Sequence, residues 1–184
     1  MELHTERLLL REFTADDAEP MHAWQTDPRY LEHYPVTHVS WYETRDLVKR
    51  FLAWQAEQPR CRRQLAICLR GTGELIGCAG VRCASEGAAT ADVGFELDPD
   101  HWRFGYGTEA MGCLVTFAFD ELGLDELTAR TVAANVRALR LLEHLGFRPV
   151  RTIPAGPEGD EGDDRHWPER VECRLTRRDR QAGR

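Results

Sequence analysis

Hydrophobic and polar residues alternate over several short segments of the chain, and the clearest case is 91–97. Ala91, Val93, Phe95 and Leu97 share one face of this segment, and the residues between them are polar or glycine. A period of two predicts a β-strand with one buried face. Further strands are predicted over 7–13, 63–69, 75–83, 127–132, 147–153 and 169–175.

Other segments carry hydrophobic residues at the spacing of an α-helix. Met111, Leu114, Val115 and Ala118 recur at intervals of three and four residues, which predicts a long helix with one buried stripe. Gly123 follows this stripe and is predicted to end the helix. The remaining helices are predicted over 15–26, over 41–57 and, as a shorter helix, around 138–145.

Two of these helices carry recognisable N-terminal signals. Thr14 with Asp17, and Ser40 with Glu43, have the spacing of a capping box. The D-P dipeptide at 27–28 is predicted to end the first helix, because a residue that precedes proline is disfavoured in the helical conformation.

The order of these elements predicts the fold class. One strand and two helices are followed by a hairpin and a third strand, then by two strand–helix crossovers and two final strands. This order predicts a mixed α/β domain, with a mostly antiparallel central sheet of about seven strands flanked by about four helices. A single domain is expected over 1–176, because 184 residues suit one core. The basic tail 177–184 is expected to be disordered.

Composition and charge narrow the function. The chain is 42% hydrophobic and 30% charged, which is typical of a globular protein. Its net charge of −7 argues against nucleic-acid binding, which needs a basic face. No apolar run is long enough to span a membrane, and the first residues lack a basic signal-peptide region. A cytoplasmic protein that binds neither nucleic acid nor membrane is therefore expected.

The six cysteines and seven histidines do not indicate a metal site. The cysteines contain no C-x-x-C pair, and the histidines lack the close spacing of metal ligands. Most of the cysteines lie within apolar runs, so we expect buried, reduced thiols and no metal.

The stretch W-R-F-G-Y-G-T-E-A at 102–110 lies where a predicted strand meets the long helix. The first turn of a helix has unpaired N–H groups and a partial positive charge. Glycine lets the chain turn tightly and lets an anion approach the backbone. Gly105 and Gly107 therefore predict a phosphate site, although a tight turn alone would also explain them. A third glycine with dinucleotide-binding spacing and a G-K-[ST] sequence are both missing.

Several spaced motifs together resemble the GNAT superfamily of acyl-CoA-dependent N-acetyltransferases, and within it the ribosomal-protein alanine acetyltransferases. These motifs are T-E-R-L-L-L-R-E-F near the start, G-E-L-I-G-C-A-G-V, the glycine stretch, and N-V-R-A-L-R-L-L-E-H-L-G-F at 135–147. The resemblance covers most of the chain. It implies acetyl-CoA as a cosubstrate and a primary amine as the acceptor, either a protein N-terminus or a small amine, in a monomer or homodimer.

The resemblance also implies which residues bind acetyl-CoA. The backbone amides of the glycine loop would take the pyrophosphate, and the pantetheine arm would follow the strand that ends at Leu97. Asn135 matches an asparagine that hydrogen-bonds this arm, although a helix N-cap would also explain it. The implied set is Leu97, Arg103, Phe104, Gly105, Tyr106, Gly107, Thr108 and Asn135. The loop departs from the family at its first position, where Trp102 replaces Gln or Arg.

Acetyl transfer requires a neutral amine, so a general base is useful at neutral pH. Glu96 is the leading candidate, because it points away from the predicted buried face and a glutamate on this strand is the base in several superfamily members. A solvent-facing side chain with no role is the alternative. Asp92 and Asp98 are weaker candidates.

The proton donor for the leaving thiol cannot be assigned from the motifs. The family's usual tyrosine is Leu142 here, and the serine frequent in this branch is Ala138. A catalytically weak acyl-CoA sensor or interaction module is therefore an alternative to an enzyme. A nucleotide-phosphate site unrelated to CoA is a third interpretation.

The resemblance implies an acceptor site formed by the region between the first strand and the second helix, and by the last hairpin. The predicted substrate residues are Tyr30, His33, Tyr34 and Trp167, within a wider set that adds Trp24, Trp41, His166 and Glu172. Aromatic side chains such as these also fill cores, which is the alternative for each of them.

Overall fold

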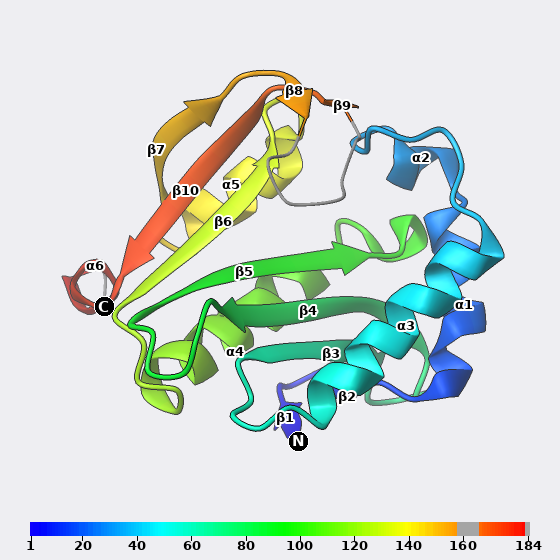
Figure 1. The fold of residues 1–184 in the computed structure, drawn as a ribbon, viewed down its shortest axis with the longest axis horizontal. Coiled ribbons are helices and arrows are strands. Elements are labelled where there is room, and N and C mark those ends of the chain that lie inside the picture. The colour runs from blue at the N-terminus through cyan, green and yellow to red at the C-terminus, as the bar shows by residue number, and fades with distance from the viewer. Residues whose placement is uncertain (158–165, 183–184) are drawn as a thin grey trace.

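The computed structural model describes residues 1–157 and 166–182. An eight-stranded sheet forms the centre of the molecule, with strand order β1-β2-β3-β4-β5-β6-β10-β7 (Figure 1). Its strands are β1 (Glu2–His4), β2 (Leu8–Glu12), β3 (Arg62–Leu69), β4 (Leu75–Cys83), β5 (Thr90–Leu97), β6 (Glu126–Val132), β7 (Arg148–Ile153) and β10 (Arg170–Thr176). Strands β8 (Gly156–Pro157) and β9 (His166–Trp167) form a separate short pair.

Helices cover both faces of this sheet. They are α1 (Ala18–Gln25), α2 (Pro28–Leu31), α3 (Trp41–Gln55), α4 (Tyr106–Asp120), α5 (Val136–His144) and α6 (Arg177–Ala182). Helices α1 and α3 lie in front of the sheet in Figure 1, and α4 and α5 lie behind it. Each layer buries its own hydrophobic cluster. The α4 stripe, which includes Met111 and Leu114, is fully buried as predicted.

The predicted fold class is confirmed, and the described residues contain more short elements than predicted. Strand β1 adds an edge to the sheet by pairing Leu3 with Leu10. Helix α2 begins within the D-P dipeptide, at Pro28, and its N-cap Asp27 accepts a hydrogen bond from the Arg29 amide. Proline is disfavoured inside a helix but suits its first turn. The dipeptide that ends one helix therefore also begins the next.

The capping signals appear where they were predicted. The Ser40 amide donates to the Glu43 carboxylate at 2.7 Å, and the Glu43 amide donates back to the Ser40 hydroxyl at 3.3 Å. The Thr14 amide donates to Asp17 at 2.7 Å. Here the chain first makes a short 3-10 turn, Ala15–Asp17, and then enters α1.

The expectation that the basic tail is disordered was wrong for 177–182, which form α6. Arg177 donates to the carbonyl oxygens of Phe119 and Leu124, both at 2.6 Å. Arg180 pairs with Asp120 at 2.6 Å. The end of α4 carries partial negative charge, so cationic side chains bind favourably there. Residues 183–184 and the acidic stretch 158–165 lie outside the described residues.

The junction of β5 and β6 is the feature of the fold that creates a site. Among the described strands this is the one parallel pair, and it extends only from Thr90 opposite Glu126 to Asp92 opposite Thr128. Beyond this point the two strands diverge, as Figure 1 shows. The ends of β5 and β6 therefore form the two sides of an opening in the sheet.

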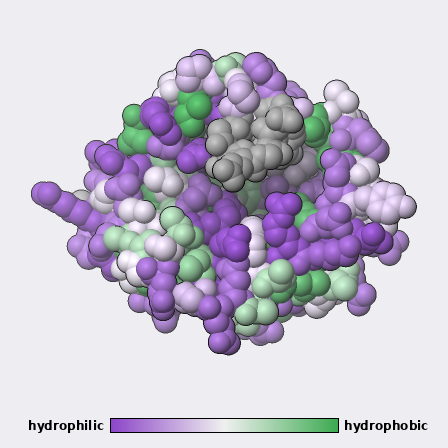
Figure 2. Space-filling view, in the orientation of Figure 1, coloured by the Kyte–Doolittle hydropathy of each residue, from purple (hydrophilic) through white to green (hydrophobic). Residues whose placement is uncertain are grey.

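Three further features of the fold are the polarity of its surface, the length of its helices and the state of its cysteines. The face shown in Figure 2 is mainly hydrophilic, with small scattered hydrophobic patches. No helix within the described residues is long and apolar enough to cross a membrane. All six cysteines are free thiols, of which Cys68, Cys78 and Cys173 are buried and the others half-buried.

Candidate functional site

A cavity of about 570 Å³ lies between the diverging ends of β5 and β6. Its size is in the range of small-molecule and cofactor sites. The predicted site residues that line it are Tyr30, His33, Tyr34, Glu96, Leu97, Arg103, Gly105, Tyr106, Gly107, Thr108, Asn135 and Trp167. Phe104 was predicted with them but is not among the lining residues. Its side chain is 60% exposed and stacks on Tyr106, with ring centroids 5.9 Å apart.

The four residues that the wider acceptor set adds do not line the cavity. Trp24 is buried in the α1/α3 core, and Trp41 packs against the His22 ring on the outside of these helices. His166 is exposed on β9, and Glu172 forms ion pairs with two arginines. Trp24, Trp41 and Glu172 thus have their contacts elsewhere in the fold, and His166 is exposed.

Asp92 and Asp98, the weaker candidates for a base, are also absent from the lining. Asp92 pairs with Arg82 at 2.7 Å. Asp98 accepts a hydrogen bond from the Asp100 amide and caps a short 3-10 turn. Among the described residues, no group of three or more His, Cys, Asp and Glu is placed to hold a metal ion.

The two glycines of the loop are required for different structural reasons. Gly105 is the N-cap of α4 and has φ 84°, and Arg103, two residues earlier, also has a positive φ of 70°. The loop thus turns sharply just before the helix. Gly107 instead is buried, and a Cβ there would lie 3.0 Å from Leu141 and 3.1 Å from Phe95. Gly105 permits the turn, and Gly107 permits close packing of α4 against β5 and α5.

Three residues, which we call the loop clamp, connect the segment before β2 to the glycine loop and α4: Thr5, Arg7 and Glu109. Glu109 accepts hydrogen bonds from the Thr5 hydroxyl at 2.5 Å, the Arg7 amide at 2.8 Å and the Arg7 Nε at 2.7 Å. Arg7 also donates to the Phe104 carbonyl oxygen at 2.9 Å, and its guanidinium lies over the Tyr106 ring. The clamp therefore fixes both ends of the glycine turn.

The loop clamp predicts a measurable effect on ligand binding. Burial raises the pKa of Glu109, but the bonds from Thr5 and Arg7 outweigh it and lower the pKa overall. The clamp is thus complete at neutral pH and is lost only as pH falls through that lowered value. Glu109→Gln is expected to weaken acetyl-CoA binding about tenfold in calorimetric titration, because hydrogen bonds to charged groups contribute about 1.5–3 kcal/mol each.

The matched control is Glu121→Gln, at the opposite end of α4, where the exposed carboxylate contacts neither the loop nor the clamp. This variant should bind acetyl-CoA like the unmodified protein. Equal affinities for the two variants would show that the clamp does not organise the loop.

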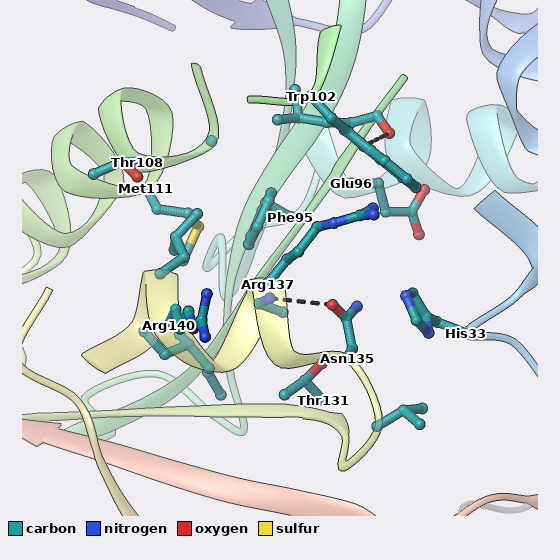
Figure 3. Close-up of a pocket in the computed structure, with 18 of the residues that line it drawn as sticks. His33, Phe95, Glu96, Trp102, Thr108, Met111, Thr131, Asn135, Arg137 and Arg140 are labelled. Carbon is teal, nitrogen blue, oxygen red and sulfur yellow. Dashed lines mark hydrogen bonds between the residues drawn. The ribbon is translucent and has the colours of Figure 1, made fainter. Parts of the chain in front are cut away.

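Two arginines of α5 bring positive charge to the cavity. Arg137 and Arg140 line it, and both are exposed. In Figure 3 both side chains extend from α5 toward the cavity. The Arg137 guanidinium lies 4.9 Å from the centre of the Trp102 ring, and the Trp102 indole donates to the Leu97 carbonyl oxygen at 3.0 Å. Together with the start of α4, these cations make the opening suitable for a polyanion.

Sequence reasoning did not identify these arginines. The available signal was that the two arginines are three residues apart and follow Asn135 by two and five residues, at the beginning of the predicted short helix. Asn135 itself is the N-cap of α5, with its side chain accepting from the Ala138 amide at 3.1 Å. The N-cap alternative is thus confirmed, and the contact with CoA stays a prediction. Ala138 and Leu142 also line the cavity, so neither position offers a hydroxyl.

Glu96 lies at the inner end of the cavity and faces the α1/α3 side of the sheet. Its β4 partner is Cys78, which belongs to the hydrophobic cluster on that side. The Tyr34 hydroxyl donates to Glu96 Oε1 at 3.2 Å, and the Cys78 thiol lies 3.9 Å from Oε2. Figure 3 shows Glu96 and His33 on the same side of the cavity. Glu96 is thus half-buried and lines the cavity, and its role as a base stays a prediction.

Burial raises the pKa of Glu96, and hydrogen bonds from Tyr30 and Tyr34 only partly oppose this effect. A carboxylate with a raised pKa accepts a proton more readily than an exposed glutamate does. The pKa values of Tyr30 and Tyr34 are raised well above the ordinary range, first by burial and then by the charge of Glu96. Both phenols thus keep their protons and act as donors.

An aromatic wall stands beside Glu96. Tyr30 and Tyr34 stack with ring centroids 4.5 Å apart, and Trp167 from β9 lies 6.0 Å from Tyr34. A carboxylate beside aromatic faces is a favourable environment for an organic cation. The cavity thus has a cationic, loop-lined end and an acidic, aromatic end.

Comparisons with known proteins identify this architecture. The family model described as an acetyltransferase (GNAT) domain matches residues 7–148. The uncharacterized N-acetyltransferase YoaA of Bacillus subtilis (strain 168) is 31% identical over 147 residues, which are 79% of this chain and 82% of that protein.

Two solved structures illustrate the likeness of fold. The ribosomal-protein-S5-alanine acetyltransferase of Vibrio fischeri has a TM-score of 0.76 at 14% identity, over 96% of both chains. The spermidine N-acetyltransferase of Vibrio cholerae, solved in complex with CoA and spermine, has a TM-score of 0.75 at 14% identity. That alignment covers 96% of this chain and 99% of the other.

Proposed function

The chain belongs to the GNAT acetyltransferase family, and we propose that it moves the acetyl group of acetyl-CoA to a primary amine by direct attack in a ternary complex. The family implies acetyl-CoA-dependent N-acetylation. The acceptor and the roles of individual residues are our proposal. The observation that supports it is a single cavity lined by both the glycine loop and Glu96, where a thioester and a base would meet.

Acetyl-CoA fits the cationic end of the cavity. The amides at the start of α4 and the guanidinium groups of Arg137 and Arg140 would hold the pyrophosphate. The pantetheine arm would lie between the diverging strands, beside Leu97 and Asn135. The thioester would then be directed toward Glu96, at the opposite end.

The amine would enter at the aromatic end and lose a proton to Glu96. The neutral nitrogen attacks the carbonyl carbon of the thioester, so a C–N bond forms and the C–S bond breaks. One proton of the amine is exchanged for the acetyl group, and the departing sulfur gains a proton as CoA forms. Alignment of the two reactants supplies much of the acceleration. A backbone N–H near Leu97 would stabilise the negative charge on the carbonyl oxygen.

We propose Tyr30, His33, Tyr34 and Trp167 as the residues that contact the acceptor. Their support is that they line the cavity around Glu96. A protein N-terminus and a small polyamine both arrive as cations, which this end of the cavity suits. These two acceptor classes are also those in the names of the two structurally similar proteins, an S5-alanine acetyltransferase and a spermidine acetyltransferase.

A catalytically weak acyl-CoA sensor is the second candidate, favoured by one observation. The two positions where hydroxyl donors are frequent, Ala138 and Leu142, line the cavity without one. In this case the cavity would bind acetyl-CoA but release little CoA when amines are added.

Calorimetry and an assay of thiol release separate these functions. We expect saturable binding of acetyl-CoA, followed by release of free CoA thiol when a peptide with N-terminal alanine or a polyamine such as spermidine is added. Tight binding without release for either amine class would favour the sensor. Failure to bind acetyl-CoA would contradict both proposals.

A further inference from the structure

Two of the six cysteines lie opposite each other, where β3 begins beside the end of β4. The last pair of this ladder joins Arg62 to Arg82, so the next residues outward, Cys61 and Cys83, are direct neighbours. The Cys83 amide donates to the Cys61 carbonyl oxygen at 2.9 Å, which extends the ladder by one pair. Residues directly opposite in adjacent strands carry their side chains on the same face of the sheet. The two thiols therefore share one face.

The spacing of the two backbones suits a disulfide. Residues in a hydrogen-bonded antiparallel pair have Cα atoms about 5.5 Å apart. Disulfides usually join cysteines whose Cα atoms are about 4.4–6.8 Å apart. The other three strand cysteines, Cys68, Cys78 and Cys173, are each paired with residues of other types. Cys61 and Cys83 are thus the pair that the sheet itself positions for a covalent bond.

Both thiols are also accessible. They are free and half-buried, whereas Cys68, Cys78 and Cys173 are buried. Cys61 and Cys83 both line a surface hollow of about 600 Å³, which lies between the end of α3 and the beginning of β3. A small reagent in this hollow can therefore reach either sulfur.

A positive charge lies on the same face as the two thiols. Arg63 follows Cys61 by two residues and is paired with Val81, two residues before Cys83. Side chains two residues apart on a strand share a face, and a cation near a thiol favours the reactive thiolate. Burial raises the pKa of Cys83 overall, and the charge of Arg63 partly opposes this effect.

We propose that Cys61 and Cys83 form a modification site, at which a small disulfide converts the two thiols reversibly into a cross-strand disulfide. Neither cysteine lines the cavity of the glycine loop, so the inference is independent of the proposed function. The pair lies at the opposite end of the sheet from that cavity, because Cys83 is paired with Ala91 near the beginning of β5.

The reaction is two successive thiol–disulfide exchanges. One cysteine thiolate attacks a sulfur of the reagent, whose S–S bond breaks, and half of the reagent leaves as a thiolate. The second cysteine thiolate attacks the sulfur of the first cysteine and displaces the other half. The two cysteines are oxidised and the reagent is reduced to two thiols, which take up the two protons that the cysteines lose.

The test treats the full, reduced protein with oxidised glutathione. We expect the number of free thiols to fall from six to four, because the new bond consumes two. The intact mass should decrease by two hydrogen atoms, and peptide mapping should link Cys61 to Cys83. The glutathione adduct should not accumulate, since the second thiol is held beside the first. Dithiothreitol should restore all six thiols.

Single substitutions identify the pair. Cys61→Ser and Cys83→Ser should each stop at a glutathione adduct on the remaining cysteine of the pair, and either variant is sufficient if the other does not fold. Cys113→Ser is the control, because it removes another half-buried thiol, on α4, and should form the same link as the unmodified protein. The proposal is overturned if the unmodified protein keeps six thiols, accumulates the adduct without the link, or links other cysteines.

Discussion

Glu96→Gln is expected to lower kcat by about 100-fold or more, because general bases contribute about 10²–10⁴-fold to the rate. Glutamine keeps the volume of the side chain and can still accept the hydrogen bond from Tyr34. It cannot take a proton from the amine. The affinity for acetyl-CoA should stay unchanged, since Glu96 lies at the end of the cavity away from the glycine loop. Steady-state kinetics with a saturating amine and calorimetry of acetyl-CoA binding measure the two quantities.

The pH dependence of kcat/KM provides an independent check of the same role. Burial raises the pKa of Glu96, so in the unmodified protein the active, ionised fraction grows as pH rises through that raised value. The acidic limb of the profile should therefore titrate above the ordinary range of a glutamate. In Glu96→Gln this limb should disappear, and the deprotonation of the amine alone should shape the profile.

Asp92→Asn is the matched control for this variant. Asp92 lies on the same strand and is a carboxylate of similar charge, but it pairs with Arg82 and does not line the cavity. Its kcat should stay within a few-fold of the unmodified value. A Glu96→Gln protein with full activity, or an Asp92→Asn protein with none, would remove Glu96 from its proposed role.

The position of Glu96 was predicted from the sequence, whereas the contacts that support the site were not. The alternation in 91–97 predicted both the strand and the face on which Glu96 lies, because a period of two is a local property. The loop at 102–110 was predicted from another local pattern, the two glycines at the junction of a strand and a helix. Short elements such as β1 and α2 lack enough periodic residues to be recognised and depend on tertiary contacts.

The supporting contacts are long-range, which explains why no local pattern revealed them. Arg7 and Glu109 are 102 residues apart, and Tyr34 and Glu96 are 62 apart. The first pairing depends on how β2 packs under α4, and the second on how the segment after α2 folds back onto β5. The wrong placement of Trp24 has a similar origin, because burial in a core and exposure to a cavity both favour aromatic residues.

Gly105→Val is expected to reduce acetyl-CoA affinity about 100-fold or more, with the fold retained. Gly105 has φ 84°, a conformation that β-branched residues strongly disfavour, and a Cβ there would lie 3.3 Å from the Arg7 guanidinium. Valine would therefore straighten the turn and push the loop clamp aside. The amides at the start of α4 would then lose their common direction toward the pyrophosphate. Calorimetric titration with acetyl-CoA measures the loss.

Gly87→Val separates this effect from backbone strain in general. Gly87 has φ 71°, but a Cβ there would meet no atom within 4 Å, and the residue lies in the loop before β5, outside the cavity lining. Both variants impose comparable strain, so their melting temperatures should fall by similar amounts, whereas only Gly105→Val should lose acetyl-CoA. Gly105→Asn should retain much of the affinity, because asparagine tolerates a positive φ. If Gly105→Val instead bound acetyl-CoA as tightly as Gly87→Val, Gly105 would be only a tight turn, and the polyanion would have to be held by Arg137 and Arg140 on the opposite side of the cavity.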